Sequence, residues 1–178
     1  PLTTLPGMAE RCIRISSAGK TFSMTGWKVG YSVGPPNLID AVAKAHQFLT
    51  FTTPPNLQMA TAYGLKKDFN FFKDLGITMQ SKRDRLTRGL ENIGFNVMES
   101  EGTYFLAVDF QPIGYKGNDI EFCRYLTTEV GVAAVPFSAF YQRGIESGVD
   151  HFIRFCFCKK DEILDKAIER LSDHFTKK

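Results

Sequence analysis

A short segment near the start of the chain carries the residues best suited to covalent chemistry. Lys20 lies directly after the small residues 17–19, which themselves follow an apolar stretch. A lysine amine becomes a nucleophile when burial or a neighbouring cation lowers its pKa toward neutrality, and lysines undergo such shifts more readily than arginines. The segment indicates an amine held for Schiff-base chemistry. A solvated loop lysine is the alternative that the residues leave open.

Two further residues of this segment could hold an anion beside that amine. Ser17 offers a hydroxyl donor, and Lys28 offers a cationic donor in the same loop region. Hydroxyl and ammonium groups are suitable partners for a phosphate, and Gly26 leaves room for close approach of the backbone. The pattern predicts an anion-binding pocket next to a reactive lysine.

A late apolar segment contributes a second candidate binding residue, Arg154. In an extended chain it shares one face with Phe152, Cys156 and Cys158. A buried arginine must meet an anion, because an unpaired buried charge is costly. Two interpretations stay open from the residues alone: an internal salt bridge to a carboxylate, or a binding position for a substrate carboxylate held by two hydrogen bonds.

The apolar pattern of the first half predicts the elements that position the lysine segment. We expect strands at 12–15 and 29–33, a helix at 36–47 and another from 54 or 55 onward. Alternation of strands and helices is typical of an α/β sheet layer. The expected inner side of the helix at 36–47 consists of Leu38, Ile39, Val42 and Ala45.

From about residue 75 the pattern changes to a long amphipathic helix that Gly94 ends. Asn118 and Glu121 are spaced as a capping box for a later helix. We therefore place a domain boundary so that residues 1–74 and 75–178 form separate domains. Further strands are expected at 95–98, 104–110, 132–135 and 152–158. The expected inner faces of the two later helices are Ile120, Cys123, Leu126 and Val130, then Ile163, Leu164, Ala167, Ile168 and Leu171.

Residues 17–30, with the pattern Ser-x-x-Lys-Thr-Phe-Ser-x-Thr-Gly-Trp-Lys-Val-Gly, resemble the cofactor-lysine segment of fold-type I aminotransferases that depend on pyridoxal 5'-phosphate (PLP). Within these class I/II enzymes the chain looks closest to kynurenine aminotransferase/glutamine transaminase K and bacterial methionine aminotransferase. Matching segments follow in the same order, so the resemblance covers nearly the whole chain. They are 5–8, 101–105, 132–136 and 152–157.

The resemblance implies an α/β fold of the aspartate aminotransferase-like type. Residues 1–74 would be the C-terminal end of the large PLP-binding domain with the end of its sheet, and residues 75–178 the α+β small domain. The chain would be the C-terminal portion only, without the groups that stack on the cofactor ring and pair with its pyridine nitrogen. We therefore expect this chain alone to bind the cofactor weakly and to turn over little or nothing.

The resemblance also implies roles for particular residues. Lys20 would form the Schiff base with PLP and later move a proton, and Ser17 and Lys28 would bind the phosphate. Most relatives carry arginine in place of Lys28, so a point charge would replace a bidentate donor. Arg154 would bind the substrate α-carboxylate. Phe51 would reach the substrate pocket of a neighbouring subunit in a homodimer.

The activity implied is transfer of an amino group between an amino acid and a 2-oxo acid. Phe51 favours an aromatic or large apolar donor, such as kynurenine, glutamine or methionine. Thr52 stands where the mammalian enzyme has histidine, which bears on side-chain preference. Two alternatives stay open: a cysteine-conjugate β-lyase on the same scaffold, and an inactive truncated fragment that serves as an interaction module.

Composition sets outer limits on function. The net charge of +3 on 178 residues is small and scattered, so no nucleic-acid partner is expected. No apolar run approaches the roughly 20 residues of a membrane span, and no signal peptide is recognised, so a cytoplasmic protein is expected. The four cysteines lack metal-type spacing. We expect no metal, and buried free thiols at Cys12, Cys156 and Cys158.

Overall fold

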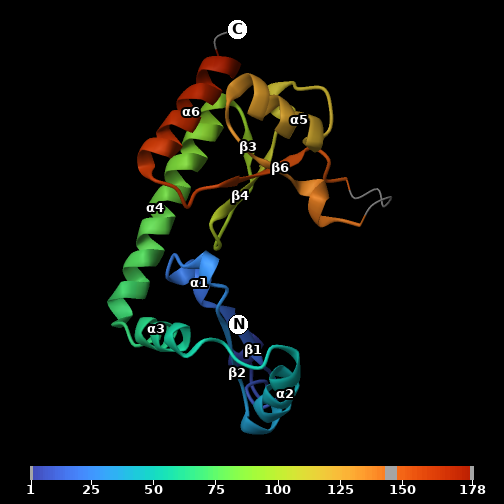
Figure 1. Cartoon of the computed structure of the whole chain (residues 1–178). Helices are drawn as coiled ribbons and strands as arrows, with labels where there is room; N and C mark the ends of the chain where they lie inside the picture. Colours follow the sequence, from blue (N-terminus) through green and yellow to red (C-terminus); the bar gives the residue numbers. More distant parts are fainter. Residues whose placement is uncertain (1, 143–147, 177–178) are drawn as a thin grey trace. The chain divides into compact units, whose positions relative to one another are not determined.

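The computed structural model describes residues 2–142 and 148–176 and divides the chain into two compact units (Figure 1). The first unit is Pro1–Phe69 and the second is Asn70–Lys178. The assignment of residues 1–74 and 75–178 to two enzyme domains stays a prediction.

The first unit is built on a two-stranded antiparallel hairpin. Strands β1 (Arg14–Ser17) and β2 (Gly30–Val33) pair from Arg14 opposite Val33 to Ser17 opposite Gly30. The strand expected at 12–15 thus lies two residues further along the chain. The other elements of the unit are η1 (Leu2–Thr4), α1 (Ala18–Thr21), η2 (Thr25–Trp27), α2 (Pro36–Leu49) and α3 (Pro55–Leu65).

Prolines start both long helices of this unit. Pro36 and Pro55 occupy the first helical position, where the missing N–H costs no hydrogen bond. The inner side expected for α2 is wrong, because α2 has no buried residue and Val42 is 39% exposed. A hairpin of two short strands offers too little surface to cover such a helix.

The second unit combines an antiparallel sheet with three helices. Helix α4 (Phe69–Ile93) precedes a four-stranded sheet with the order β3-β4-β6-β5. It starts about six residues before the expected position, and Gly94 follows it with φ +108°. The remaining elements are β3 (Asn96–Val97), β4 (Phe105–Asp109), η3 (Gln111–Ile113), α5 (Asp119–Tyr125), the π-helical turn η4 (Leu126–Val130), β5 (Val135–Pro136), η5 (Phe137–Phe140), β6 (Phe152–Cys156) and α6 (Asp161–Phe175).

The core of the second unit lies between one face of this sheet and the helices. Strands β4 and β6 alternate in burial, so Leu106 and Val108 face the core together with Ile153 and Phe155. This period of two follows from the pleat of a strand. The helices complete the core with Leu86, Leu90, Ile93, Phe122, Cys123, Leu126, Val130, Leu164 and Leu171.

The start of α5 is confirmed in detail. Asn118 Oδ1 accepts from the Glu121 N–H at 3.0 Å, and Glu121 Oε2 accepts from the Asn118 N–H at 3.1 Å. The predicted inner faces are wrong at Ile120 and Ile163, which are 45% and 54% exposed. Both residues lie in the first turn of a helix, and in α5 it is Phe122 that fills the core.

The cysteines differ from expectation. Cys123 is the buried thiol, whereas Cys12 and Cys156 are half-buried and Cys158 is exposed. The physical reason is the length of β6, which ends at Cys156 and leaves Cys158 outside the sheet.

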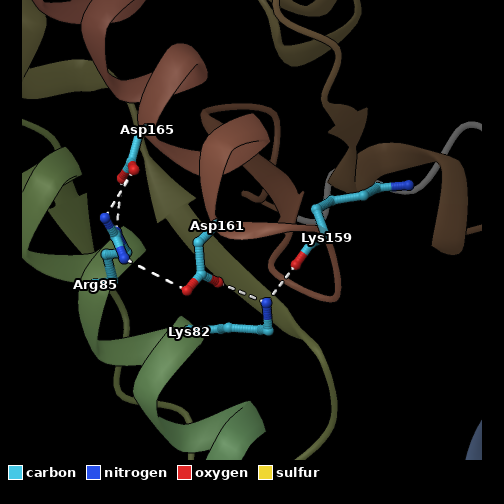
Figure 2. A network of polar contacts seen from close by, with 5 residues as sticks. All are labelled: Lys82, Arg85, Lys159, Asp161 and Asp165. Atoms are coloured by element: carbon cyan, nitrogen blue, oxygen red, sulfur yellow. Dashed lines mark hydrogen bonds and ion pairs between the residues drawn. The ribbon is translucent and has the colours of Figure 1, made fainter.

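Helices α4 and α6 run side by side and are joined by charged side chains (Figure 2). Lys82 Nζ donates to Asp161 Oδ1 and to the Lys159 carbonyl, each at 2.6 Å. Arg85 holds Asp165 through two hydrogen bonds, from Nε at 2.6 Å and Nη2 at 2.7 Å. Among residues 2–142 and 148–176, no helix has the length and apolar character needed to cross a membrane.

Candidate active site

The lysine segment begins where β1 ends. Ser17 is the N-cap of the short helix α1, and its Oγ accepts from the Gly19 N–H at 3.2 Å. Lys20 lies in the last turn of α1 with an exposed side chain. The sequence predicted that the lysine lies in a loop. In the structure it lies in a single helical turn at the end of the hairpin.

After this helical turn the chain folds back, so that residues 24 and 25 pack against Gly19. The Gly19 carbonyl accepts from the Met24 N–H at 2.9 Å and from Thr25 Oγ1 at 3.2 Å. A Cβ atom on Gly19 would stand only 3.1 Å from the Thr25 Cα. Close packing of these two backbones thus requires glycine at position 19 and fixes the path of the segment after Lys20.

Lys28 lies between η2 and strand β2. It caps η2 in the left-handed conformation, with φ +56°, and its side chain is exposed. The next residue, Val29, accepts from the Ala18 N–H at 3.0 Å, and Ser17 pairs with Gly30. Backbone pairing therefore places Ser17, Lys20 and Lys28 at one end of the hairpin.

Phe51 lies beyond the end of α2. Its backbone is left-handed, with φ +72°, and its N–H donates to the His46 carbonyl at 2.9 Å. The ring is 73% exposed. Phe51 lines a cleft of about 420 Å³ together with Val29, His46 and Thr52. Its role in the substrate pocket of a neighbouring subunit stays a prediction.

In the second unit, Arg154 lies on β6 between two aromatic rings. Its guanidinium carbon is 3.8 Å from the centroid of Phe105 and 4.4 Å from that of Phe140. The Nε atom is buried and has no hydrogen-bond partner among residues 2–142 and 148–176. Within the same ranges no carboxylate lies within salt-bridge distance of Arg154. The described residues therefore favour a guanidinium that can bind a substrate anion over one held in an internal salt bridge.

Sequence reasoning did not assign Phe105 and Phe140 to this arginine. Phe105 belongs to a segment that also suits core packing, and its ring is only half-buried. Phe140 ends the turn η5, where Phe137 and Phe140 recur at a spacing of three. The spacing of these two aromatic residues after β5 is the sequence feature that could have indicated Phe140 as a neighbour of Arg154.

The candidate residues differ in chemistry from a typical group of metal ligands. Within residues 2–142 and 148–176 no group of three or more histidine, cysteine or acidic side chains could hold a metal ion. The candidate residues are instead an amine, a hydroxyl, an ammonium group and a guanidinium. This set suits organic anions and a carbonyl group.

Comparison with known proteins identifies the family. The family model for aminotransferase class I and II matches residues 4–171. The chain therefore belongs to this family, as the resemblance indicated.

Named relatives share the sequence over nearly the whole chain. The probable N-succinyldiaminopimelate aminotransferase DapC of Mycobacterium tuberculosis is 46% identical over 178 residues, covering 97% of this chain and 45% of that protein. The kynurenine–oxoglutarate transaminase of Dictyostelium discoideum is 42% identical, covering 94% and 42%. The methionine aminotransferase of Escherichia coli is 40% identical, covering 93% and 42%.

Solved structures confirm the α/β fold of fold-type I aminotransferases. The N-succinyldiaminopimelate aminotransferase of M. tuberculosis matches with a TM-score of 0.88 at 46% identity, over 97% of this chain and 44% of that one. The E. coli protein YbdL, for which a methionine aminotransferase function is described, matches with a TM-score of 0.89 at 39% identity and the same coverage. The chain thus spans less than half the length of these relatives.

Proposed function

We propose that this chain is the lysine-bearing part of a PLP-dependent aminotransferase. The proposal is supported by the backbone pairing of Ser17 with Gly30, which brings chain positions 17, 20 and 28 to one end of the β1–β2 hairpin, in a chain whose family match spans residues 4–171. The chain spans 45% or less of the three named relatives. We infer from the resemblance of residues 17–30 that it corresponds to the C-terminal portion of such an enzyme, with the end of the large domain at 1–74 and the small domain at 75–178.

The donor set fits the proposed cofactor. The exposed amine of Lys20 suits an aldehyde, and the Ser17 hydroxyl with the Lys28 ammonium suits a phosphate. When bound, PLP supplies an electron sink that stabilises negative charge at the substrate Cα. Lys20 Nζ would take the proton from that Cα and return it as a general acid.

Arg154 is the proposed partner of the substrate carboxylate. A guanidinium presents paired N–H donors that match the two carboxylate oxygens. Stacking on Phe105 and Phe140 restricts the plane of the guanidinium without neutralising its charge, because the rings are themselves uncharged. Among the described residues the buried Nε of Arg154 has no acceptor, which supports this role, because a buried donor without an acceptor is costly unless a ligand supplies one.

The substrates proposed are an amino acid with an aromatic or large apolar side chain and a 2-oxo acid, in a cytoplasmic homodimer. Phe51 supports this choice, since its ring is exposed beside a cleft and could contact a second subunit's substrate. Turnover by this chain alone is expected to be slight, because the ring-stacking and pyridine-nitrogen partners would come from outside it.

Borohydride reduction tests the proposal directly. The chain is incubated with PLP, reduced, digested and mapped by mass spectrometry. We expect the phosphopyridoxyl label to favour Lys20 over Lys66, an exposed lysine outside the site. Lys20→Arg should remove the preferred label, Lys66→Arg should not, and Lys28→Met should weaken labelling without moving it. Equal labelling of exposed lysines in the parent chain and in Lys20→Arg would overturn the proposal.

A further inference from the structure

Two thiols meet at the end of β6, apart from the residues assigned above. The Sγ atoms of Cys156 and Cys158 lie 3.2 Å apart, and both cysteines are free. A disulfide bond is about 2.05 Å long, so the sulfurs need to approach by only about 1.2 Å to bond. The contact joins side chains two positions apart on one face of an extended chain.

Local backbone structure explains how these sulfurs come together. Phe157, between the two cysteines, is buried, and its N–H donates to the Tyr104 carbonyl at 3.0 Å. The Lys159 N–H then donates to the Phe157 carbonyl at 2.8 Å, which closes a three-residue turn centred on Cys158. Two residues of straight strand rise about 6.6 Å, near the upper limit of Cα separations in disulfides. The side chains of Cys156 and Cys158 lie on one face of the extended chain, and the turn bends the backbone after Cys158.

The two thiols have different surroundings. Cys158 is exposed, whereas Cys156 is half-buried and lines a cleft of about 410 Å³ that Lys159, Lys166 and Arg170 also line. Burial raises the pKa of the Cys156 thiol, and its hydrogen bond with Cys158 acts in the same direction. Access therefore favours Cys158 as the first sulfur to meet an oxidant, with Cys156 close enough to react next.

We propose that Cys156 and Cys158 form an oxidisable dithiol site, converted by peroxide to an intrachain disulfide. In the first step the Cys158 thiolate attacks one oxygen of hydrogen peroxide, giving a sulfenic acid and releasing hydroxide. In the second step the Cys156 sulfur attacks the Cys158 sulfur, the S–O bond breaks, and the oxygen leaves as water with the thiol proton. The two thiols lose two electrons, and the peroxide is reduced to two waters.

Reversal by small thiols follows from the short ring. A disulfide between residues two positions apart is confined by the backbone of Phe157, and strained or exposed disulfides are the readily reduced ones. Cys123 lacks these properties, since it is buried and its pKa is raised to about 12, mainly by burial. Cys123 is therefore not expected to react under conditions that oxidise the pair at the end of β6.

Peptide mapping of the folded chain tests the site. After limited peroxide treatment and alkylation, trypsin cleavage at Arg154 and Lys159 releases the peptide 155–159. We expect this peptide to have lost the mass of two hydrogens, to resist alkylation, and to regain both thiols with dithiothreitol. Peptide 155–159 carrying sulfinic or sulfonic acid at Cys158 beside an alkylated Cys156, or disulfides linking two chains, would overturn the proposal.

Single variants assign the order of reaction. Cys156→Ser should leave a sulfenic acid on Cys158 that dimedone traps. In the Cys158→Ser variant, Cys156 should react about tenfold more slowly than Cys158 does in the Cys156→Ser variant. The reason is that Cys156 is half-buried and burial raises the pKa of its thiol. Cys12→Ser is the matched control and should leave the 155–159 disulfide unchanged. Equal reactivity of the two single variants would contradict the roles assigned to the sulfurs.

Discussion

The guanidinium of Arg154 lies 3.8 Å above the ring of Phe105, although the two residues are not direct cross-strand partners. Arg154 pairs with Ala107, and Phe105 pairs with Cys156, so the contact runs diagonally between β6 and β4. Diagonal neighbours in a sheet are about 7–8 Å apart, a distance that aromatic and long side chains bridge. The ring holds the guanidinium in place and leaves its positive charge for an anion.

A double-mutant cycle should detect this contact as coupling. We expect Phe105→Leu and Arg154→Met to show a coupling free energy of about 0.5–1 kcal/mol in unfolding, the range of a cation–π pair at a partly exposed site. Urea unfolding of the parent chain, both single variants and the double variant gives the coupling. Phe105→Leu combined with Arg85→Met is the control, and its effects should add within about 0.5 kcal/mol. Additive effects for the Arg154 pair would show that the stacking contributes nothing.

Asp119 secures the turn that carries the second ring. Its side chain is 1% exposed, and its oxygens accept from the Ser138 N–H at 2.7 Å and the Ser138 hydroxyl at 3.0 Å. Asp119→Ala leaves both donors without an acceptor, so we expect a loss of about 3 kcal/mol in unfolding free energy. Ser138→Ala removes only the hydroxyl bond and should cost about 1 kcal/mol. Equal losses in the two variants would contradict the role of the backbone N–H.

Local signals in the sequence predicted much of this structure. Gly94 ends α4, Asn118 and Glu121 form the expected capping box, and Pro36 and Pro55 begin helices. Each of these depends on a few neighbouring residues and on backbone rules that hold in any fold. The resemblance carried by residues 17–30 likewise found the family, because a motif is itself local.

Contacts between distant segments could not be predicted in the same way. The sequence identified Arg154 as needing an anion or a partner, but it could not show that Phe140 would lie 4.4 Å away. That contact depends on η5 being attached to α5 through Ser138 and Asp119. Burial of α2 was likewise overestimated, because an amphipathic pattern does not state which surface will cover it.

Asp161 should make stability sensitive to acid. Its hydrogen bond from Lys82 is the main cause that lowers the pKa of this carboxyl below the ordinary 3.8, and the charges of Lys82 and Arg85 add to it. Because the folded pKa lies below the unfolded one, this stabilisation is present above about pH 4 and disappears as the pH falls through the lower folded value. Asp161→Asn should therefore lose less stability than the parent chain on acidification, as measured by urea midpoints across that interval.

Salt provides the control for the effect at Asp161. Its side chain is 52% exposed and that of Arg85 is 44% exposed, whereas that of Lys82 is 17% exposed, so ions screen part of the interaction. We expect the difference between the parent chain and Asp161→Asn to shrink at about 1 M salt. A difference that is independent of both pH and salt would mean that the substitution acts through helix packing rather than charge.

Cys123 should make stability sensitive to alkali. Burial, with a smaller effect of the Asp119 charge, raises the pKa of the Cys123 thiol from 9.0 to about 12. The unfolded chain loses this proton first, so the folded state loses relative stability as the pH rises from about 9 toward 12. Under reducing conditions, Cys123→Ala should show a shallower fall of the urea midpoint above pH 9 than the parent chain. Parallel curves would show that the thiol does not titrate differently in the two states.

Two glycines of α4 should respond oppositely to the same substitution. A Cβ on Gly89 would stand 2.5 Å from Ile168 Cδ1 and 2.7 Å from its Cγ1 on α6, whereas a Cβ on Gly76 would meet nothing within 4 Å. Alanine favours a helix over glycine by about 1 kcal/mol, so Gly76→Ala should raise the unfolding free energy by that amount. Gly89→Ala adds the same helical preference but forces α4 and α6 apart, with an expected net loss of about 1–3 kcal/mol.

A second substitution separates crowding from any other effect at Gly89. Ile168→Val removes the Cδ1 atom that lies nearest to the added methyl group, so in the Gly89→Ala background it should cost less than in the parent chain, or even restore stability. Ile168→Val combined with Gly76→Ala should show additive effects, because the two positions share no contact. If Gly89→Ala stabilised the chain as Gly76→Ala is expected to, the close approach of α4 and α6 at this position would be wrong.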